Sequence, residues 1–228
     1  TKISPGCKHC YAEIMARRLH AMGAPGYKNG FKLSLHPDRL SHPFSRKRPT
    51  IYFVNSMSDL FHKDVPNKFL DEVFTTIKET PQHTYQILTK RADRLPSYFS
   101  KRKCPPNVWL GVSVEDRRYG TPRIDLLRPV NARIRFLSVE PLLEDIGKID
   151  LTGIHWVIVG GESGHKARPM SEKWVENIKQ QADKAGVAFF FKQWGGWGAD
   201  GIKRHKKTNG RLFKGRVWNA YPEMQSSF

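Results

Sequence analysis

Residues 108–141 read VWLGVSVEDRRYGTPRIDLLRPVNARIRFLSVEP, with an apolar, β-rich run near each end, at 108–112 and 133–137. Each run passes directly into a serine and a glutamate two positions apart, first Ser113 and Glu115 and then Ser138 and Glu140. Residues two apart share one face of an extended chain. We therefore expect two strands that carry the same pair of polar side chains to their carboxyl ends.

The same arrangement recurs along the chain. We expect seven strands, at residues 31–35, 50–54, 84–88, 108–112, 133–137, 155–159 and 187–191. Segments with helical spacing lie between most of them, and strands that alternate with helices are typical of a parallel sheet joined by crossover helices. The sequence predicts an α/β fold, a partial or complete (β/α) TIM-like barrel with parallel strands and outer helices.

Three helices are expected from apolar residues three or four positions apart. Helix 67–79 has a possible cap at Asn67, and helix 171–185 is expected to stop at Gly186. The third is helix 11–22. Their inward side chains should be Phe69, Leu70, Val73, Phe74 and Ile77, then Trp174, Val175, Ile178 and Ala182, then Ile14, Met15 and Leu19. Two crossovers are less regular: 91–100 is broken by Pro96, and 142–151 should hold only a short helical turn.

Composition fits one folded unit. The chain has 228 residues, of which 39% are hydrophobic, and that length is enough to bury one sizeable core. Residues 1–195 should form the barrel, and the Gly- and Lys-rich residues 196–228 a basic tail or lid. We expect a cytoplasmic protein with no membrane partner, because there is no apolar run of about 18 residues and three cysteines suit a reducing compartment.

The chain is strongly basic, with 39 Lys and Arg against 21 acidic residues and a net charge of +18. Such an excess attracts polyanions, which makes nucleic acid or a nucleotide the expected substrate. Basic clusters lie in three expected loops, at residues 46–48, 101–103 and 203–207. The alternative is a solubility charge spread over every face.

Polar residues follow six of the expected strands. The carboxyl ends of parallel strands converge on one crevice, which is where such folds bind ligands. Ordinary capping of strand ends explains any one of these segments, but it explains six together poorly. The candidates for a ligand-binding mouth are Asn55, Ser56, Asp59, Lys90, Ser113, Glu115, Ser138, Glu140, Glu162 and Lys192.

A second candidate lies near the start of the sequence, where residues 4–11 read SPGCKHCY. The Cys-x-x-Cys spacing places the Cys7 and Cys10 thiolates close enough to bind one metal ion or cluster, and the preceding glycine permits a tight loop. Two cysteines do not complete a site. A structural zinc with His9, His20 or Cys104, or a redox dithiol, also fits this pattern.

Several segments together resemble the phage-associated three-cysteine-motif proteins, thought to be related to radical SAM enzymes. They are residues 3–13, 55–62, 88–91, 110–115, 136–142, 160–164 and 191–195, and the resemblance covers nearly the whole chain. It implies a four-iron four-sulfur cluster held by Cys7, Cys10 and a further cysteine upstream of Thr1. Such an enzyme binds S-adenosyl-L-methionine, takes an electron from an external one-electron reductant, and generates a 5′-deoxyadenosyl radical.

The resemblance also implies roles for the mouth residues. The expected cofactor contacts are His9, Tyr11, Asn55, Ser56, Asp59, Ser113 and Ser138, with His9 placed against adenine. The expected substrate contacts are Lys90, Glu115, Glu140, Glu162 and Lys192. The substrate would be nucleic acid or a nucleotide. Two other functions stay open: a nucleic-acid-binding accessory protein without turnover, and a metal-assisted hydrolase that uses the carboxylates of the mouth.

Overall fold

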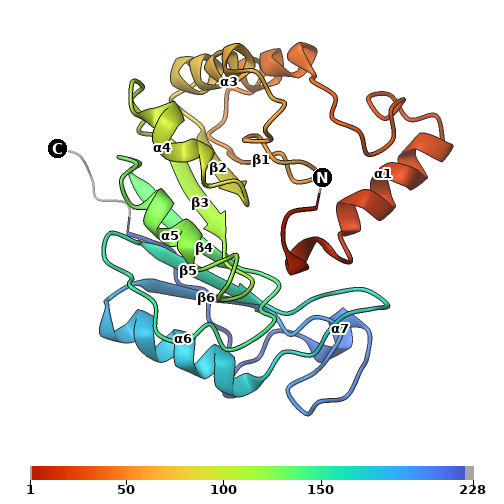
Figure 1. Ribbon diagram of the computed structural model, residues 1–228, viewed down its shortest axis with the longest axis vertical. Coiled ribbons are helices and arrows are strands. Elements are labelled where there is room, and N and C mark those ends of the chain that lie inside the picture. The colour runs from red at the N-terminus through yellow and green to blue at the C-terminus, as the bar shows by residue number, and fades with distance from the viewer. Residues whose placement is uncertain (1, 224–228) are drawn as a thin grey trace.

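The computed structural model describes residues 2–223, in which six strands form one parallel sheet that curves into a half-barrel (Figure 1). The strands pair in chain order. They are β1 (Ile51–Val54), β2 (Thr84–Thr89), β3 (Val108–Ser113), β4 (Ile134–Val139), β5 (Trp156–Gly160) and β6 (Ala188–Gln193). The predicted α/β fold with a partial barrel is confirmed, and six of the seven expected strands are present.

The outer face of the sheet is covered by helices α3 (Asn67–Glu79), α4 (Arg94–Phe99), α5 (Pro122–Leu127) and α6 (Glu172–Lys184) (Figure 1). The main core lies between them and the strands, and buries Leu70, Ile77, Leu110, Val112, Leu137, Val157, Val175 and Ile178 among others. On another side of the sheet stand α1 (Tyr11–Ala21) and the short α7 (Lys206–Asn209). Three shorter elements are η1 (Pro5–Cys7), η2 (Pro37–Ser41) and α2 (His42–Ser45).

A smaller aromatic cluster fills the inner face of the half-barrel. It consists of Trp109, Ile134, Phe136 and Trp156, with Phe190 packed against it. Gly111 makes room for this layer, because a Cβ atom there would lie 2.5 Å from the Phe136 ring. Side chains alternate along a strand, so the inner-face positions that follow this layer carry the polar groups. The cluster therefore forms the floor beneath the predicted mouth.

Two predicted elements are wrong. Residues 31–35 form no strand. They do not pair with the free edge of β1, which pairs only with β2 among the described residues. Residues 142–151 form a loop without a helical turn. The loop turns where Gly147 adopts a φ of 70°, a conformation that interrupts a helix, and the Asp145 carboxylate accepts the Gly147 amide at 2.9 Å.

The helices also depart from expectation in detail. Pro66, not Asn67, is the residue before α3, although its apolar stripe is inward as predicted. Pro96 does not break the 91–100 segment, because α4 begins at Arg94 and proline is tolerated in a first helical turn. In α1 the expected stripe is wrong: Ile14 and Met15 are exposed, and the buried side chains are two alanines.

The segment after residue 195 packs against the sheet. Phe213 is buried in the main core, and the backbone near Trp218 bonds to the free edge of β6, where the Phe191 amide donates to the Trp218 carbonyl at 3.0 Å. Thr1 and residues 224–228 of the predicted tail lie outside the described residues. Among the described residues, every helix is too short or too polar to cross a membrane.

Candidate functional site

A cavity of about 1460 Å³ opens at the carboxyl ends of the strands and extends along β1 to residues of α3. It is lined by all but one of the predicted site residues: Cys7, His9, Cys10, Tyr11, Asn55, Ser56, Asp59, Lys90, Ser113, Ser138, Glu140, Glu162 and Lys192. Segments far apart in the sequence thus converge on one opening, which we call the mouth cavity. Glu115 is the exception, because its side chain is completely buried beneath the lining.

The cysteine loop, residues 4–10, lies across the mouth. Pro5 starts the single 3₁₀ turn of η1, in which the Cys7 amide donates to the Ser4 carbonyl at 2.9 Å. Cys10 then occupies the position before α1. Both thiols are half-buried and line the mouth cavity. The turn therefore presents two sulfur atoms to the same space as the strand-end acids and lysines.

Glu115, which follows β3, holds the first part of this loop. Its Oε1 atom accepts a bond from Ser4 Oγ at 2.8 Å and an ion-paired bond from Lys90 Nζ. Its Oε2 atom accepts from Arg123 Nη1 at 2.5 Å. Gly6 rests on the same carboxylate, because a Cβ there would lie 2.5 Å from Oε1. We call this group the Glu115 clamp.

The charge of the Glu115 clamp is fixed by its partners. Burial alone would raise the pKa of Glu115, but the adjacent Lys90 and Arg123 outweigh it and lower that pKa below its usual range. The carboxylate is therefore charged and has no accessible surface. Such a group cannot reach a ligand directly, and its bonds position the loop that carries Cys7.

Glu162, which follows β5, holds the loop from another side. Arg168 donates to both of its carboxylate oxygens, through Nη2 to Oε1 at 2.6 Å and through Nε to Oε2 at 2.8 Å. The same Nη2 donates to the Pro5 carbonyl at 3.0 Å. Burial opposes ionisation, but Arg168 prevails and the pKa of Glu162 is lowered. A second carboxylate thus anchors the cysteine loop through an arginine.

Glu140, which follows β4, is placed differently. Its Oε2 atom pairs with Lys192 Nζ at 2.9 Å, whereas its buried Oε1 atom has no hydrogen-bond partner among the described residues. A Cβ on Gly160 would lie 2.4 Å from this Oε1, so the absence of a side chain at Gly160 leaves room for the carboxylate. The Lys192 side chain is 55% exposed. Glu140 and Lys192 are therefore the acid and base that remain available to a ligand.

The residues after β1 have mixed positions. Asp59 accepts bonds from Thr89 Oγ1 at 2.7 Å, the Lys90 amide at 3.0 Å and Arg91 Nη1 at 3.0 Å, so it joins the loops after β1 and β2. Asn55 and Ser56 are exposed, and the Ser56 carbonyl accepts a bond from Tyr11 Oη. The Asp59 carboxylate is thus engaged by other residues of the protein, whereas Asn55 and Ser56 are exposed residues of the cavity lining.

Ser113 and Ser138 are direct neighbours across β3 and β4 and are both nearly buried. Sequence reasoning gave no role to three residues that shape this site, Ser4, Arg123 and Arg168, and it did not foresee that Gly6 makes room for the Glu115 carboxylate. Each acts through a partner more than five positions away in the sequence, and arginines in a chain this basic carry no distinguishing signal. Only the tertiary fold brings them to the glutamates.

Cys7 and Cys10 fit two ligand positions of an iron–sulfur cluster, because thiolates are its usual ligands and both face the cavity. Within residues 2–223, no group of three or more His, Cys, Asp and Glu side chains could hold a metal ion. Cys104 packs against the main core instead, where burial raises its pKa to about 12. The zinc alternative with His9, His20 or Cys104 therefore gains no support from these residues.

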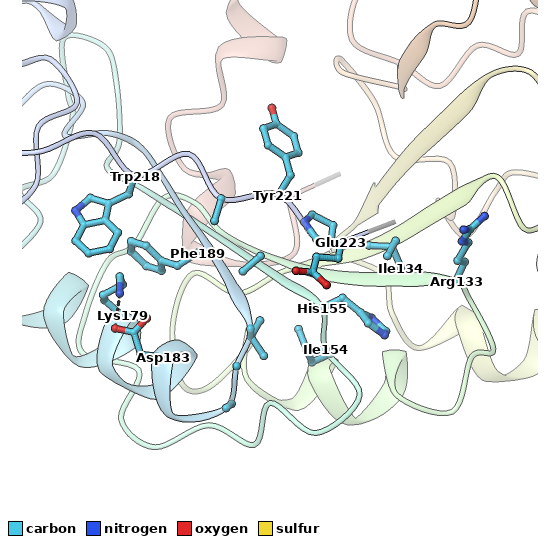
Figure 2. Close-up of a pocket in the computed structure, with 16 residues that line it drawn as sticks. Arg133, Ile134, Ile154, His155, Lys179, Asp183, Phe189, Trp218, Tyr221 and Glu223 are labelled. Atoms are coloured by element: carbon cyan, nitrogen blue, oxygen red, sulfur yellow. Dashed lines mark hydrogen bonds and ion pairs between the residues drawn. The ribbon is translucent and has the colours of Figure 1, made fainter. Parts of the chain in front are cut away.

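A second cavity of about 580 Å³ opens at the amino ends of β4, β5 and β6 (Figure 2). Arg133, His155, Lys179, Asp183 and Tyr221 are among its lining residues. None of the predicted site residues lies there. The candidate chemistry is thus confined to the opposite end of the sheet, at the mouth cavity.

Comparison with known proteins gives a family without an assigned activity. Residues 1–222 match the family described as "Protein of unknown function (DUF5131)". No curated protein and no solved structure matches the chain. Because the match extends over almost the entire sequence, the chain belongs to the DUF5131 family.

Proposed function

We propose that this protein is an iron–sulfur enzyme of the radical SAM type that acts on nucleic acid or a nucleotide. The observation that carries the proposal is the cysteine loop, which two buried carboxylates hold across the mouth so that both thiols face the same cavity as Glu140 and Lys192. The two thiols lie at the strand ends, where parallel α/β folds bind their ligands, and this location supports a metal-binding role for them.

In the proposed enzyme, Cys7 and Cys10 are two ligands of a four-iron four-sulfur cluster. The third ligand would be the further cysteine that the resemblance implies, because no group of three His, Cys, Asp or Glu side chains within residues 2–223 completes a metal site. With S-adenosyl-L-methionine bound and one electron taken from an external donor, such a cluster would supply a 5′-deoxyadenosyl radical and release methionine. The half-barrel supplies the cavity that would bind the cofactor and the substrate.

The other residues divide into two groups. Glu115 and Glu162 position the cysteine loop, because their oxygens are engaged by Arg123, Arg168 and their neighbours. Glu140 and Lys192 pair with each other at the cavity surface, and they are the groups assigned to contact the substrate or move a proton. The expected cofactor contacts are the cavity-lining His9, Tyr11, Asn55, Ser56, Ser113 and Ser138.

The charge of the mouth cavity supports an anionic substrate. Among the described residues that line it are eight lysines and arginines but only three carboxylates. Each carboxylate is already neutralised, Asp59 by Arg91, Glu140 by Lys192 and Glu162 by Arg168. The remaining cations leave a positive field inside a concave site, and such a field concentrates anions there. Paired carboxylates also suit a metal-assisted hydrolase poorly.

The test is anaerobic purification of the full-length protein, followed by iron analysis and electron paramagnetic resonance with and without S-adenosyl-L-methionine. We expect a brown protein with about four irons per chain and a spectrum that changes when S-adenosyl-L-methionine is added. Cys7→Ser and Cys10→Ser should each lose the iron. Cys104→Ser is the matched control and should keep it, because that thiol packs against the core. Colourless full-length protein would contradict the proposal.

The cation excess of the mouth cavity equally suits the second candidate, a nucleic-acid-binding protein without turnover. The two differ in their dependence on the thiols. If nucleic-acid binding is salt-sensitive and unaffected by Cys7→Ser and Cys10→Ser, and the full-length protein contains no iron, then the accessory protein is the correct function.

A further inference from the structure

The three basic clusters of the sequence lie at different ends of the fold. Residues 46–48 precede β1 and residues 101–103 precede β3, so both clusters are at the amino ends of strands. Neither contributes to the lining of the mouth cavity. The cluster at residues 203–207 leads into α7, on the same side of the molecule as α1 (Figure 1). Its Lys206 and Lys207 line the mouth cavity.

Lys206 and Lys207 are available for an external anion. Both are exposed, and neither side chain has an ion-pair or hydrogen-bond partner among residues 2–223. Elsewhere in the same loop, Arg204 is paired with Asp200 and the Lys203 ammonium is bonded to the His165 carbonyl. The two free ammonium groups are therefore the part of this cluster that can bind phosphate.

Arg211 extends this surface toward β6. It lines the mouth cavity, and its guanidinium lies 5.0 Å from the centre of the Phe190 ring. Its Nη2 atom donates to the Phe191 carbonyl at 3.4 Å and to Asn219 Oδ1, and its buried Nε atom has no hydrogen-bond partner. Both partners of Nη2 are neutral, and no carboxylate pairs with the side chain in the described part of the protein. A bound phosphate would supply the counter-charge that this half-buried guanidinium lacks. We call Lys206, Lys207 and Arg211 the α7 rim.

The rim borders a recess rather than a flat surface. The thiols, Glu140 and Lys192 lie at the strand ends, and the cavity wall between them includes the apolar side chains of Phe136 and Ile158. A base paired within a duplex cannot reach such a recess, because enzymes that act on a base need it unpaired or turned out of the stack. Apolar and aromatic walls suit the flat faces of an unpaired base.

We propose that the mouth cavity binds an unpaired nucleotide of a single-stranded nucleic acid whose flanking phosphates lie on the α7 rim. The inference deepens the proposed function by naming the form of the substrate. Binding itself depends on the cations of the α7 rim and on the recess, and it requires neither an iron–sulfur cluster nor turnover. The basic residues at 46–48 and 101–103 take no part in it.

The test compares two double variants that remove the same charge. Lys206→Gln/Lys207→Gln changes the α7 rim, and Lys101→Gln/Lys103→Gln changes two exposed lysines without partners in the described structure, away from the cavity. Binding of the full-length protein to a fluorescent single-stranded oligonucleotide is measured by anisotropy over a range of salt. The same oligonucleotide annealed into a duplex is the second probe.

We expect the rim variant to bind the single strand roughly tenfold more weakly and to lose about 1.4 from the magnitude of the log–log salt slope, or about 0.7 for each phosphate contact. The Lys101→Gln/Lys103→Gln variant should change the affinity by less than about threefold, because those lysines are far from the cavity and salt screens their charge. Wild-type protein should bind the duplex more weakly than the single strand. Equal losses in the two variants, or tighter binding to duplex, would overturn the inference.

Failure of the proposed function and failure of this inference can be told apart. Iron content and affinity for the single strand are measured on the same preparation of wild-type protein, so that each property can fail without the other. A protein that contains the cluster but binds the two probes equally contradicts only the inference. Selective binding by a protein that takes up no iron supports the inference and contradicts only the enzyme.

Discussion

Glu115 and Glu140 hold equivalent positions on neighbouring strands but have opposite surroundings. Each lies two residues after a serine, and those serines are direct partners across β3 and β4. Glu115 is fully buried and accepts bonds from Ser4, Lys90 and Arg123. Glu140 pairs only with the exposed Lys192 and keeps one oxygen unpartnered. Position at a strand end thus predicts where a carboxylate lies, whereas its neighbours decide whether a ligand can use it.

The difference arises from what covers each strand end. The cysteine loop lies directly on Glu115, and Arg123 from α5 reaches it from the outer layer. Glu140 has the cavity above it and Gly160 beside it. We therefore assign structure to the first glutamate and ligand contact to the second. The following predictions test that assignment, starting with the largest expected effect.

Removing the two carboxylates should affect stability very unequally. Glu115→Ala leaves Lys90 and the buried Arg123 without their partner, and loss of one member of a buried ion pair costs about 3–5 kcal/mol. Glu140→Ala removes a contact with an exposed lysine and should cost less than about 1 kcal/mol. Urea unfolding of both variants measures the difference. Equal losses of unfolding free energy would contradict the structural role assigned to Glu115 alone.

Gly6 and Gly160, which contact these carboxylates, allow a second comparison with smaller expected losses of stability. Gly6→Ala would press a methyl group against the immobilised Glu115, and overpacking of this kind costs about 1–3 kcal/mol. Gly160→Ala meets the Glu140 carboxylate, which can move into the cavity because only Lys192 holds it. We expect Gly6→Ala to destabilise the protein more and to speed alkylation of Cys7 in the metal-free protein. Faster Cys7 alkylation in Gly160→Ala alone would contradict this view of the loop.

The fold could be predicted largely from the sequence because six apolar runs alternate with segments of helical spacing, and that pattern is local. Residues 31–35 misled because their apolar alternation looks like a strand, yet no neighbouring strand is there to pair with their backbone. The α1 stripe misled for a related reason. Met15 and Leu19 have helical spacing, but α1 stands away from the sheet. Ile14 and Met15 therefore stay exposed, and the buried residues of α1 are Ala12 and Ala16.

The site was predictable in its location but not in its internal roles. Polar residues after parallel strands must meet at one edge, and the structure brings Cys7, Glu140 and Lys192 to one cavity. The assignment of Glu115 to the substrate could not anticipate Arg123 or Ser4, because their distances to it depend on how the loop and α5 pack. Burial and pairing of a charge are tertiary properties.

The smallest expected effect is the pH dependence of the Glu115 clamp. Burial opposes ionisation of Glu115, but Lys90 and Arg123 prevail and hold its pKa below the value of about 4.3 that it has when unfolded. The folded protein then binds fewer protons than the unfolded chain as the pH falls through this range. The stabilisation is therefore complete above about pH 4.3 and is lost as the pH falls through the lower folded value.

Thermal unfolding of wild type and Glu115→Gln at a series of pH values measures this effect. We expect a constant difference in Tm at neutral pH that shrinks below about pH 4, because protonation makes the wild-type side chain resemble glutamine. Glu140→Gln removes the same charge from the mouth and controls for general acid destabilisation. A difference between wild type and Glu115→Gln that persists in acid would mean that shape and neutral hydrogen bonds hold the cysteine loop. The negative charge of Glu115 would then contribute little to the stability of the Glu115 clamp.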